Sequence, residues 1–431
     1  MKKSLFALAA VGALASTAQA QSSVTVYGIV DAGYVGLNAR VAPGKAADVA
    51  KNQQSGFGDS AESTSRLGFK GNEDLGGGLS AFFTVELGLN LDTAQVINTS
   101  TTQNRQSFVG LKKAGLGNFA FGTQYTVAYN AQSATDAGQN NNVVGDITYT
   151  ADKTPTGGYT ASNLYNAKLS NSGSYDLTQG SYAGDSLTVR QNNLLTVNTD
   201  NFSGFTGHAM FMLNNQNTNQ TAGTYGSSAT VSGGTNNYNG WGLGADYAYQ
   251  KAFATVAYQS FLAQNPYAPA ASAATTAALP TGAIGTPTQF GIGQGTLPGM
   301  NIRDNQWYAA ATYDFGILKA YAQYVNRKWT SQIDPTQYLK RQGEQIGVRS
   351  FITPTIEAWA QGGLGSYAAY GAANPSAHLT TYQVGSNYWL SKRTNLYAIY
   401  GAAGTSNVTT AAGVTTSFNV NNYALGVRHT F

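Results

Sequence analysis

Apolar and polar side chains alternate along long stretches of this chain. Segments 79–91, 240–250 and 422–431 each carry an apolar residue at nearly every second position. Because neighbouring side chains point to opposite sides of a β-strand, each segment has one apolar face and one polar or small face. The segments run for about 10–15 residues, which is longer than usual globular strands and enough for the roughly 9–11 tilted residues that cross a bilayer. The alternation therefore predicts long strands with one face in an apolar environment.

Sixteen segments follow this pattern, and their connections alternate in length. The predicted strands are 24–38, 63–72, 79–91, 104–113, 118–129, 185–199, 205–216, 240–250, 252–263, 305–315, 317–329, 338–351, 355–367, 377–390, 394–403 and 417–431. Short connections such as 73–78 and 250–251 alternate with long ones such as 39–62, 130–184 and 264–304. Tight turns at one end and long loops at the other are typical of an even-stranded outer-membrane barrel. The prediction is an all-β, transmembrane antiparallel barrel that closes between its first and last strands, since an open edge in hydrocarbon would leave backbone groups unpaired.

A large soluble β-sandwich or β-helix is the alternative fold. Neither fold requires an apolar face along every long strand or an alternation of loop lengths. Tyr and Trp also gather near predicted strand ends, as at Trp241, Tyr313 and Trp389, where amphipathic rings meet a membrane–water interface. These features favour the membrane barrel.

The first twenty residues have the features of a secretory signal peptide. Lys2 and Lys3 precede an apolar stretch over 4–16, and Ala18-Gln19-Ala20 matches a small-residue cleavage site. A short membrane anchor is the alternative, but the apolar stretch is too short and ends in small residues. We therefore expect 1–20 to be a signal peptide and 21–431 to be a single barrel domain.

The composition excludes several classes of protein. Charged residues make up 10% of the chain, against about 25% in a soluble domain, and aromatic residues are too frequent for a disordered chain. The formal net charge of +4 includes no basic block, so nucleic-acid binding is not expected. The absence of cysteine excludes disulfides and thiol chemistry.

No catalytic, metal or cofactor site is expected. The three histidines, His208, His378 and His429, show neither of the spacings H-x-x-x-H and H-E-x-x-H. The glycine-rich stretch at 73–79 lacks the Gly-Lys-Ser/Thr ending of a phosphate-binding loop. A phospholipase-like barrel enzyme, or an adhesin working through its long loops, is the alternative to a channel. Stepwise ohmic conductance would distinguish the channel from both.

Several motifs resemble those of Gram-negative general porins. They are QSSVTVYGIVDAGY (21–34), TSRLGFKGNEDLGGGLSAFFTVELG (64–88), RQSFVGL (105–111), NFAFGTQY (118–125), LSKRTNLYAIYG (390–401) and the terminal VRHTF. EDLGGGL and SKRTNLY are most similar to the proteobacterial branch outside the enteric bacteria. The resemblance implies a homotrimer of sixteen-stranded barrels that lies in the outer membrane and contacts its lipid. Such a trimer passes small hydrophilic solutes and inorganic ions passively, and its third long loop folds into the pore.

The resemblance also implies a basic wall at the narrowest part of the pore. Arg66 and Lys70 share the face opposite Leu67 and Phe69, so both should point inward. Arg66 and Arg105 match members of the family's basic ladder, and Arg190 matches a third member. The alternative is that each arginine pairs with a carboxylate and only braces the wall. Because charged rings set pore selectivity, we expect a weak preference for anions.

The acidic side of the pore is expected in the third long loop. Asp136 and Asp146 are the acids in its first part, which we expect to lie inside the barrel, and the PEFGG motif of enteric relatives is absent there. At the chain end, Phe431 shares a face with Leu425 and Val427. In the family, an aromatic C-terminal strand is read by the outer-membrane assembly machinery. Simple packing of Phe431 is the alternative.

Overall fold

A computed structural model describes most of the strands and part of the connections. It covers residues 23–42, 50–92, 96, 104–149, 189–216, 223–225, 229–231, 236–264, 301–331, 338–369, 376–406, 408–409 and 415–431. The expected signal peptide, 1–20, lies outside these residues, as does most of 130–184 beyond Tyr149.

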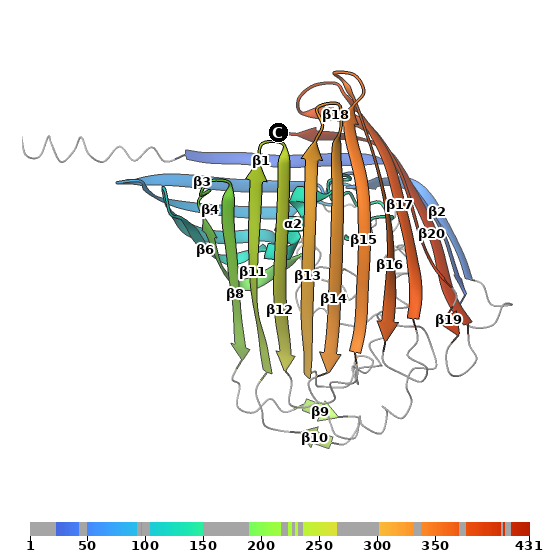
Figure 1. Ribbon diagram of the computed structural model, residues 1–431, viewed down its shortest axis with the longest axis horizontal. Helices are drawn as coiled ribbons and strands as arrows, with labels where there is room; N and C mark the ends of the chain where they lie inside the picture. Colours follow the sequence, from blue (N-terminus) through green and yellow to red (C-terminus); the bar gives the residue numbers. More distant parts are fainter. Residues whose placement is uncertain are drawn as a thin grey trace, which may run out of the picture.

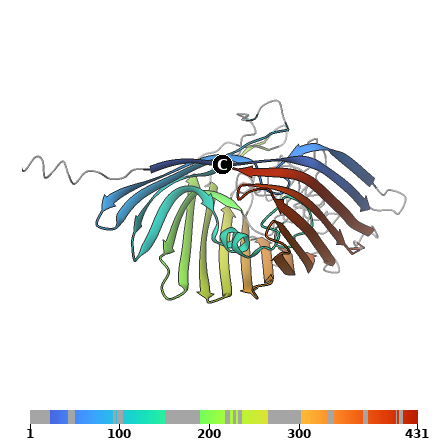
Figure 2. The ribbon, with the colours of Figure 1, turned by 90° about the horizontal axis from the view of Figure 1, so that it is seen from above.

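The strands form one antiparallel barrel (Figures 1 and 2). They are β1 (Ser23–Ala42), β2 (Ala50–Asp59), β3 (Arg66–Gly76), β4 (Leu79–Gly88), β5 (Asn104–Lys113), β6 (Gly117–Tyr125), β7 (Arg190–Thr199), β8 (Phe205–Gln216), β11 (Asn236–Tyr249), β12 (Ala252–Gln264), β13 (Asn301–Asp314), β14 (Lys319–Ser331), β15 (Tyr338–Phe351), β16 (Ile356–Ala369), β17 (Ser376–Trp389), β18 (Thr394–Thr405) and β20 (Thr415–Thr430). Short strands β9 (Gly223–Tyr225), β10 (Ala229–Val231) and β19 (Val408–Thr409), together with helix α2 (Val127–Thr135), lie in connections. Because β2 and β3 pair with the two halves of β1, they form one wall strand, and the wall has sixteen. The predicted barrel is confirmed.

The barrel closes between its first and last strands. Ile29–Ala42 of β1 pairs with Ser417–Thr430 of β20. The final residue continues the ladder, because Phe431 and Gly28 exchange two backbone hydrogen bonds of 3.1 Å. The C-terminus lies at the end of the barrel that carries the short turns (Figure 1). The seam therefore leaves little open edge in the wall.

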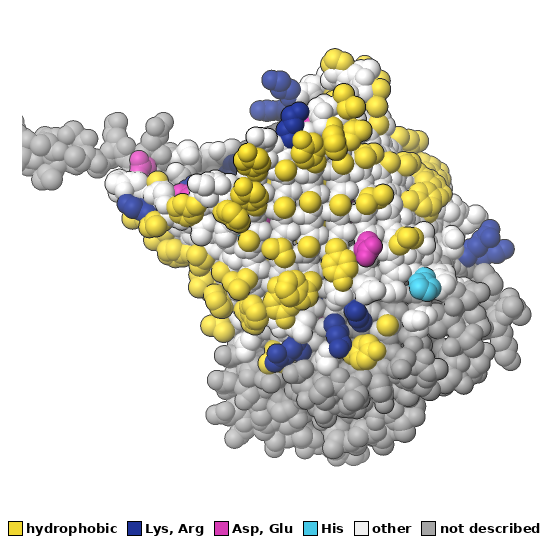
Figure 3. Space-filling view, viewed as in Figure 1, with side chains coloured by type: hydrophobic (Ala, Val, Ile, Leu, Met, Phe, Trp, Pro, Cys, Tyr) yellow, Lys and Arg dark blue, Asp and Glu magenta, His cyan; other side chains and the backbone are white. Residues whose placement is uncertain are grey.

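Polar and apolar side chains are distributed in the reverse of a soluble protein. On β14–β16, Gln323, Gln345 and Gln361 are at most 5% exposed, whereas Ile346 and Leu364 on the opposite face are 72% and 67% exposed. A broad apolar band covers the outer face (Figure 3). Within the described residues, no helix has the length and hydropathy needed to span a bilayer. The outer face is suited to lipid and the inner face to water.

Two sequence-based predictions about the strands are wrong. The predicted strand 118–129 ends at Tyr125, where Thr126 caps α2 by accepting a hydrogen bond from the Tyr129 N–H. The predicted loop 39–62 contains strand β2, which pairs with an extended β1. Residues 50–59 have no regular alternation, so only pairing with β1 identifies them as a strand.

Candidate functional site

The beginning of the third long connection lies inside the barrel. This inward loop, residues 127–149, consists of α2 and the irregular stretch 136–149, and α2 packs against β8 and β11–β14. Figure 2 shows the helix within the ring of strands. The prediction that 136–146 folds into the barrel is confirmed, because these residues bond to side chains of the inner wall.

Glycines on the inner face of the wall make room for the inward loop. Ile147 fits among Gly343, Gly363 and Gly365, where an added Cβ would lie 2.6–2.8 Å from an Ile147 side-chain carbon. A Cβ on Gly347 would lie 2.8 Å from the Cβ of Ala137. The loop therefore lies directly against β15 and β16, where larger side chains would hold it away.

Two arginines of β15 bind backbone carbonyls of the inward loop. The Arg349 guanidinium donates to the Ala137 carbonyl at 2.7 Å and forms two bonds of 2.5 and 2.7 Å with the Glu357 carboxylate. Arg341 donates to the Ile147 carbonyl at 2.5 Å. These arginines were not predicted as site residues, although both share the inward parity of Gln345. Their alternation could have identified them as inward, but not their partners.

The predicted basic residues gather around Glu86. Arg105 donates to Glu86 Oε1 at 2.7 Å and to the Tyr125 hydroxyl at 2.8 Å, and Arg66 Nη1 lies 3.9 Å from the same carboxylate oxygen. The Arg190 guanidinium lies 5.7 Å from the centre of the Tyr125 ring. The arginine cluster, Arg66, Arg105 and Arg190, thus comes together on the inner wall from β3, β5 and β7. The pairing of Arg105 and Arg66 with Glu86 is the bracing that the alternative interpretation expected. Glu86 is one carboxylate against two arginines, and the printed contact of Arg190 is with the Tyr125 ring.

Lys70 extends this positive region along β3. Its ammonium lies 5.4 Å from the centre of the Tyr27 ring, and the Tyr27 hydroxyl donates to Glu86 Oε2 at 3.1 Å. Lys70 is exposed, so its charge is solvated. The three arginines, Lys70 and Glu86 together carry a net positive charge.

Asp136, at the start of the irregular stretch, and Asp146, ten residues later, lie close together. Each is 3% exposed. Asp136 Oδ2 accepts the Asn140 N–H, and Asp146 Oδ1 accepts the Thr148 N–H, both at 2.7 Å. The two carboxyls are within hydrogen-bonding reach of each other, and burial together with this neighbour raises the pKa of Asp136 well above its ordinary value. Burial also raises the pKa of Asp146. The predicted place of this pair on the acidic side of the pore stays a prediction.

A family model described as Gram-negative porin matches residues 7–408. The chain belongs to this porin family. An outer membrane porin of Bordetella pertussis is 38% identical over 133 residues, and outer membrane porin protein 32 of Delftia acidovorans is 50% identical over 86 residues. The matches cover 30% and 20% of this porin, and only 34% and 22% of those relatives.

Solved porin structures share the fold. An anion-selective porin from Comamonas acidovorans superposes with a TM-score of 0.59 at 23% identity, covering 95% of this porin and 100% of that chain. OmpF of Salmonella typhi superposes at 0.52 with 16% identity, over 95% and 97% of the two chains. This porin is an outer-membrane protein, and its family indicates a channel rather than the barrel enzyme considered above.

A break in the second wall strand also binds the inward loop of this porin, and the sequence did not reveal it. Between β2 and β3 the chain turns inward at Ser60, which has a φ of 61°. Asn142 of the loop donates its N–H to the Ala61 carbonyl at 2.9 Å, and its side-chain amide donates to the Ser60 carbonyl at 2.7 Å. Residues 60–65, rich in Ser and Thr, resemble ordinary loop sequence, so only the tertiary contact shows their role.

Proposed function

We propose that this porin forms a water-filled outer-membrane channel for passive diffusion of small hydrophilic solutes and ions, with a weak preference for anions. The arrangement of its wall carries the proposal: polar side chains face inward, apolar side chains face outward, and one loop narrows the lumen. Export through a cleaved signal peptide at 1–20 is part of the same proposal.

The anion preference is supported by the charges around Glu86. Arginine stays protonated at any working pH, and Lys70 adds a fourth cation to the three of the arginine cluster. Asp136 and Asp146 oppose this field weakly, because both carboxyls are buried and burial raises the pKa of each. The Comamonas acidovorans porin with the same fold is itself described as anion-selective.

A simple electrostatic argument sets the size of the effect. A unit charge about 5 Å from the path of an ion changes that ion's energy by about 0.8 kcal/mol in water, and by about 0.5 kcal/mol at 0.1 M salt. That energy raises the local anion concentration about twofold and lowers the cation concentration equally. About fivefold is therefore the largest change in the anion-to-cation permeability ratio expected for one arginine, and Glu86 reduces it by offsetting part of the charge of the cluster.

The test is a reversal potential in a planar bilayer under a tenfold KCl gradient. The double variant Arg66→Gln with Arg190→Gln keeps the buried Arg105–Glu86 pair and should lower the chloride-to-potassium permeability ratio several-fold. Arg303→Gln, on the exposed outer face of β13, is the matched control and should leave the ratio unchanged. A cation-preferring wild type, or a double variant with the wild-type ratio, would show that the arginine cluster does not set selectivity.

We also propose that the protein is a homotrimer. The resemblance to general porins supports this, and the outer face of β1 and β3–β5 exposes Val26, Phe69, Val85 and Val109, which suits another subunit as well as lipid. Unheated protein in gentle detergent should migrate near three times the mass of the mature chain. A monomer under those conditions would contradict the proposal.

A further inference from the structure

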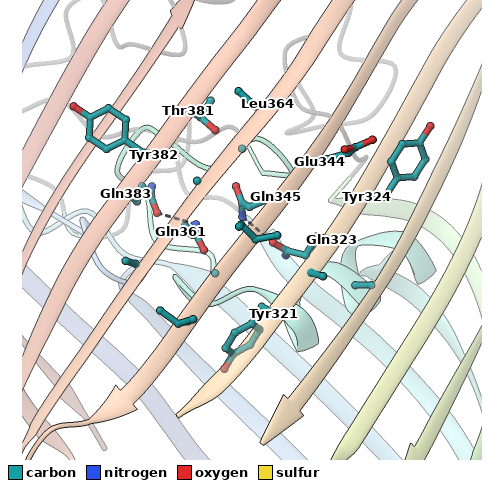
Figure 4. Close-up of a pocket in the computed structure, with 18 of the residues that line it drawn as sticks. Tyr321, Gln323, Tyr324, Glu344, Gln345, Gln361, Leu364, Thr381, Tyr382 and Gln383 are labelled. Carbon is teal, nitrogen blue, oxygen red and sulfur yellow. Dashed lines mark hydrogen bonds between the residues drawn. The ribbon is translucent and has the colours of Figure 1, made fainter. Parts of the chain in front are cut away.

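Six buried glutamines lie on six successive strands, β12 to β17. They form three directly opposed cross-strand pairs: Gln259 with Gln306, Gln323 with Gln345, and Gln361 with Gln383. All six are at most 5% exposed. Two of the pairs are visible in Figure 4, each joined by a hydrogen bond. Directly opposed residues have Cβ atoms about 4.5–5.5 Å apart, so the two amides of a pair can bond to each other.

All three pairs use the same hydrogen-bonding arrangement. One glutamine donates from Nε2 to the Oε1 of its partner, at 2.7 Å for Gln259, 2.8 Å for Gln345 and 3.1 Å for Gln361. The Oε1 of that same glutamine accepts a backbone N–H of the inward loop. The loop donors are Ala128 to Gln259 at 3.2 Å, Ile147 to Gln345 at 3.0 Å and Gly138 to Gln361 at 3.0 Å.

The third pair binds the loop through both of its members. Besides its bond from Gln361, Gln383 Oε1 accepts the side-chain amide of Asn141 at 3.0 Å, and Gln383 Nε2 donates to the Val144 carbonyl at 3.0 Å. The three contacted loop positions Ala128, Gly138 and Ile147 span nearly the whole inward loop. The pairs therefore hold it at its beginning, middle and end.

Glutamine is chemically suited to this arrangement. Its amide both donates and accepts, so one side chain can bond its cross-strand partner and the loop at once. An ionised glutamate would accept the loop N–H but could not donate to the partner, and a leucine would leave a buried N–H unpaired. The amide is also uncharged, so it adds no field of its own to the lumen.

We propose that the three glutamine pairs are positioning residues that fix the inward loop against the wall and thereby set the bore of the pore. This inference rests on the proposed channel function only where ion conductance is the measurement. Loss of a glutamine that accepts a loop N–H should free that part of the loop. The conductance should then fluctuate between two levels, one with the loop seated against the wall and one with the loop displaced.

The test combines Gln345→Leu with Gln361→Leu and measures loop release by cysteine labelling. The chain has no native cysteine, and Ala137 of the inward loop is fully buried against Gly347 of the wall. In an Ala137→Cys background, a water-soluble maleimide should react only when the loop lifts. A lost hydrogen bond should raise the displaced fraction about fivefold. The double variant should therefore label about 25-fold faster.

Two controls separate positioning from general damage. Gln342→Leu, on the same strand but the opposite face of the wall, should label at the background rate. In Ala137→Cys with Gly347→Cys, the two Cβ positions lie 2.8 Å apart in the seated loop, about 1 Å less than the roughly 3.8 Å of a disulfide. A small displacement of the loop should therefore let the disulfide form and tether the loop to the wall. When oxidised, this bridge should return the double glutamine variant to one conductance level, and a reductant should restore the fluctuation.

The possible outcomes distinguish the two proposals. Unchanged labelling in the double variant, or equal labelling in Gln342→Leu, would overturn the role of the glutamine pairs. If labelling is faster in the double variant but neither the variant nor the wild type conducts ions, the channel function is refuted and the positioning role stands. If the double variant does not assemble, Gln361→Leu alone should label about fivefold faster, and a rate equal to the background would refute the proposal.

Discussion

Replacing Gly343 with alanine should lift the inward loop from the wall. The three nearest atoms to a Cβ at this position all belong to Ile147, at 2.8, 2.9 and 3.3 Å. Overpacking of this kind costs about 1–3 kcal/mol, and that range corresponds to about a 5- to 150-fold increase in the displaced loop. The barrel itself should remain intact, because the added methyl meets the loop and not a neighbouring strand.

Shortening Ile147 should suppress this effect. Ile147→Ala removes the three carbons that the new methyl meets, so Gly343→Ala should cost little in that background, although Ile147→Ala weakens the seat by itself. The coupling between the two substitutions should equal the overpacking cost of about 1–3 kcal/mol. Gly365→Ala is the control, because its Cβ would lie 2.6 Å from Ile147 Cδ1 and also 2.4 Å from the backbone carbonyl oxygen of Gln342. Ile147→Ala removes only the first of these conflicts, so it should not rescue this variant.

Maleimide labelling of Ala137→Cys measures the displaced fraction in all four members of the cycle, and open-channel noise provides an independent measure. Wild-type labelling in Gly343→Ala would refute the close seating of Ile147. If the increase in labelling caused by Gly343→Ala is the same with Ile147→Ala present, the added methyl clashes with an atom other than those of Ile147. Rescue of Gly365→Ala by Ile147→Ala would show that the loop, and not the neighbouring backbone, limits that position.

Three further predictions concern pH, lipid and assembly. Because the pKa of Asp136 is raised, the seated loop binds more protons than the displaced loop, so seating should weaken as pH rises above the ordinary carboxyl range. Asp136→Asn should reduce this pH dependence of open-channel noise, and Asp146, whose pKa burial also raises, should keep the remainder. Leu364→Arg on the outer face should lower the free energy of unfolding in lipid vesicles by about 2–4 kcal/mol. Deleting Phe431 should reduce the assembled fraction in cells but not refolding of purified protein in detergent.

The strands and the faces of the wall could be predicted from the sequence alone. A period of two depends only on local geometry, so the alternation around Gln323 and Leu364 assigned each side chain to the lumen or to lipid before any pairing was known. The same parity indicated that Arg66 and Lys70 point inward. It would also have identified Arg341 and Arg349, whose charges lie on the inner face of β15.

Contacts between distant segments were decided by the tertiary structure. The strand at 50–59 exists because β1 pairs with it, and the break at 60–65 has meaning only where Asn142 meets it. The sequence identifies the glutamines as inward-facing residues, but which two glutamines lie opposite each other depends on strand register. Their contacts with the loop join residues 131 to 242 positions apart. No local pattern encodes such separations, because the free energy of these bonds depends on where the closed barrel places both partners.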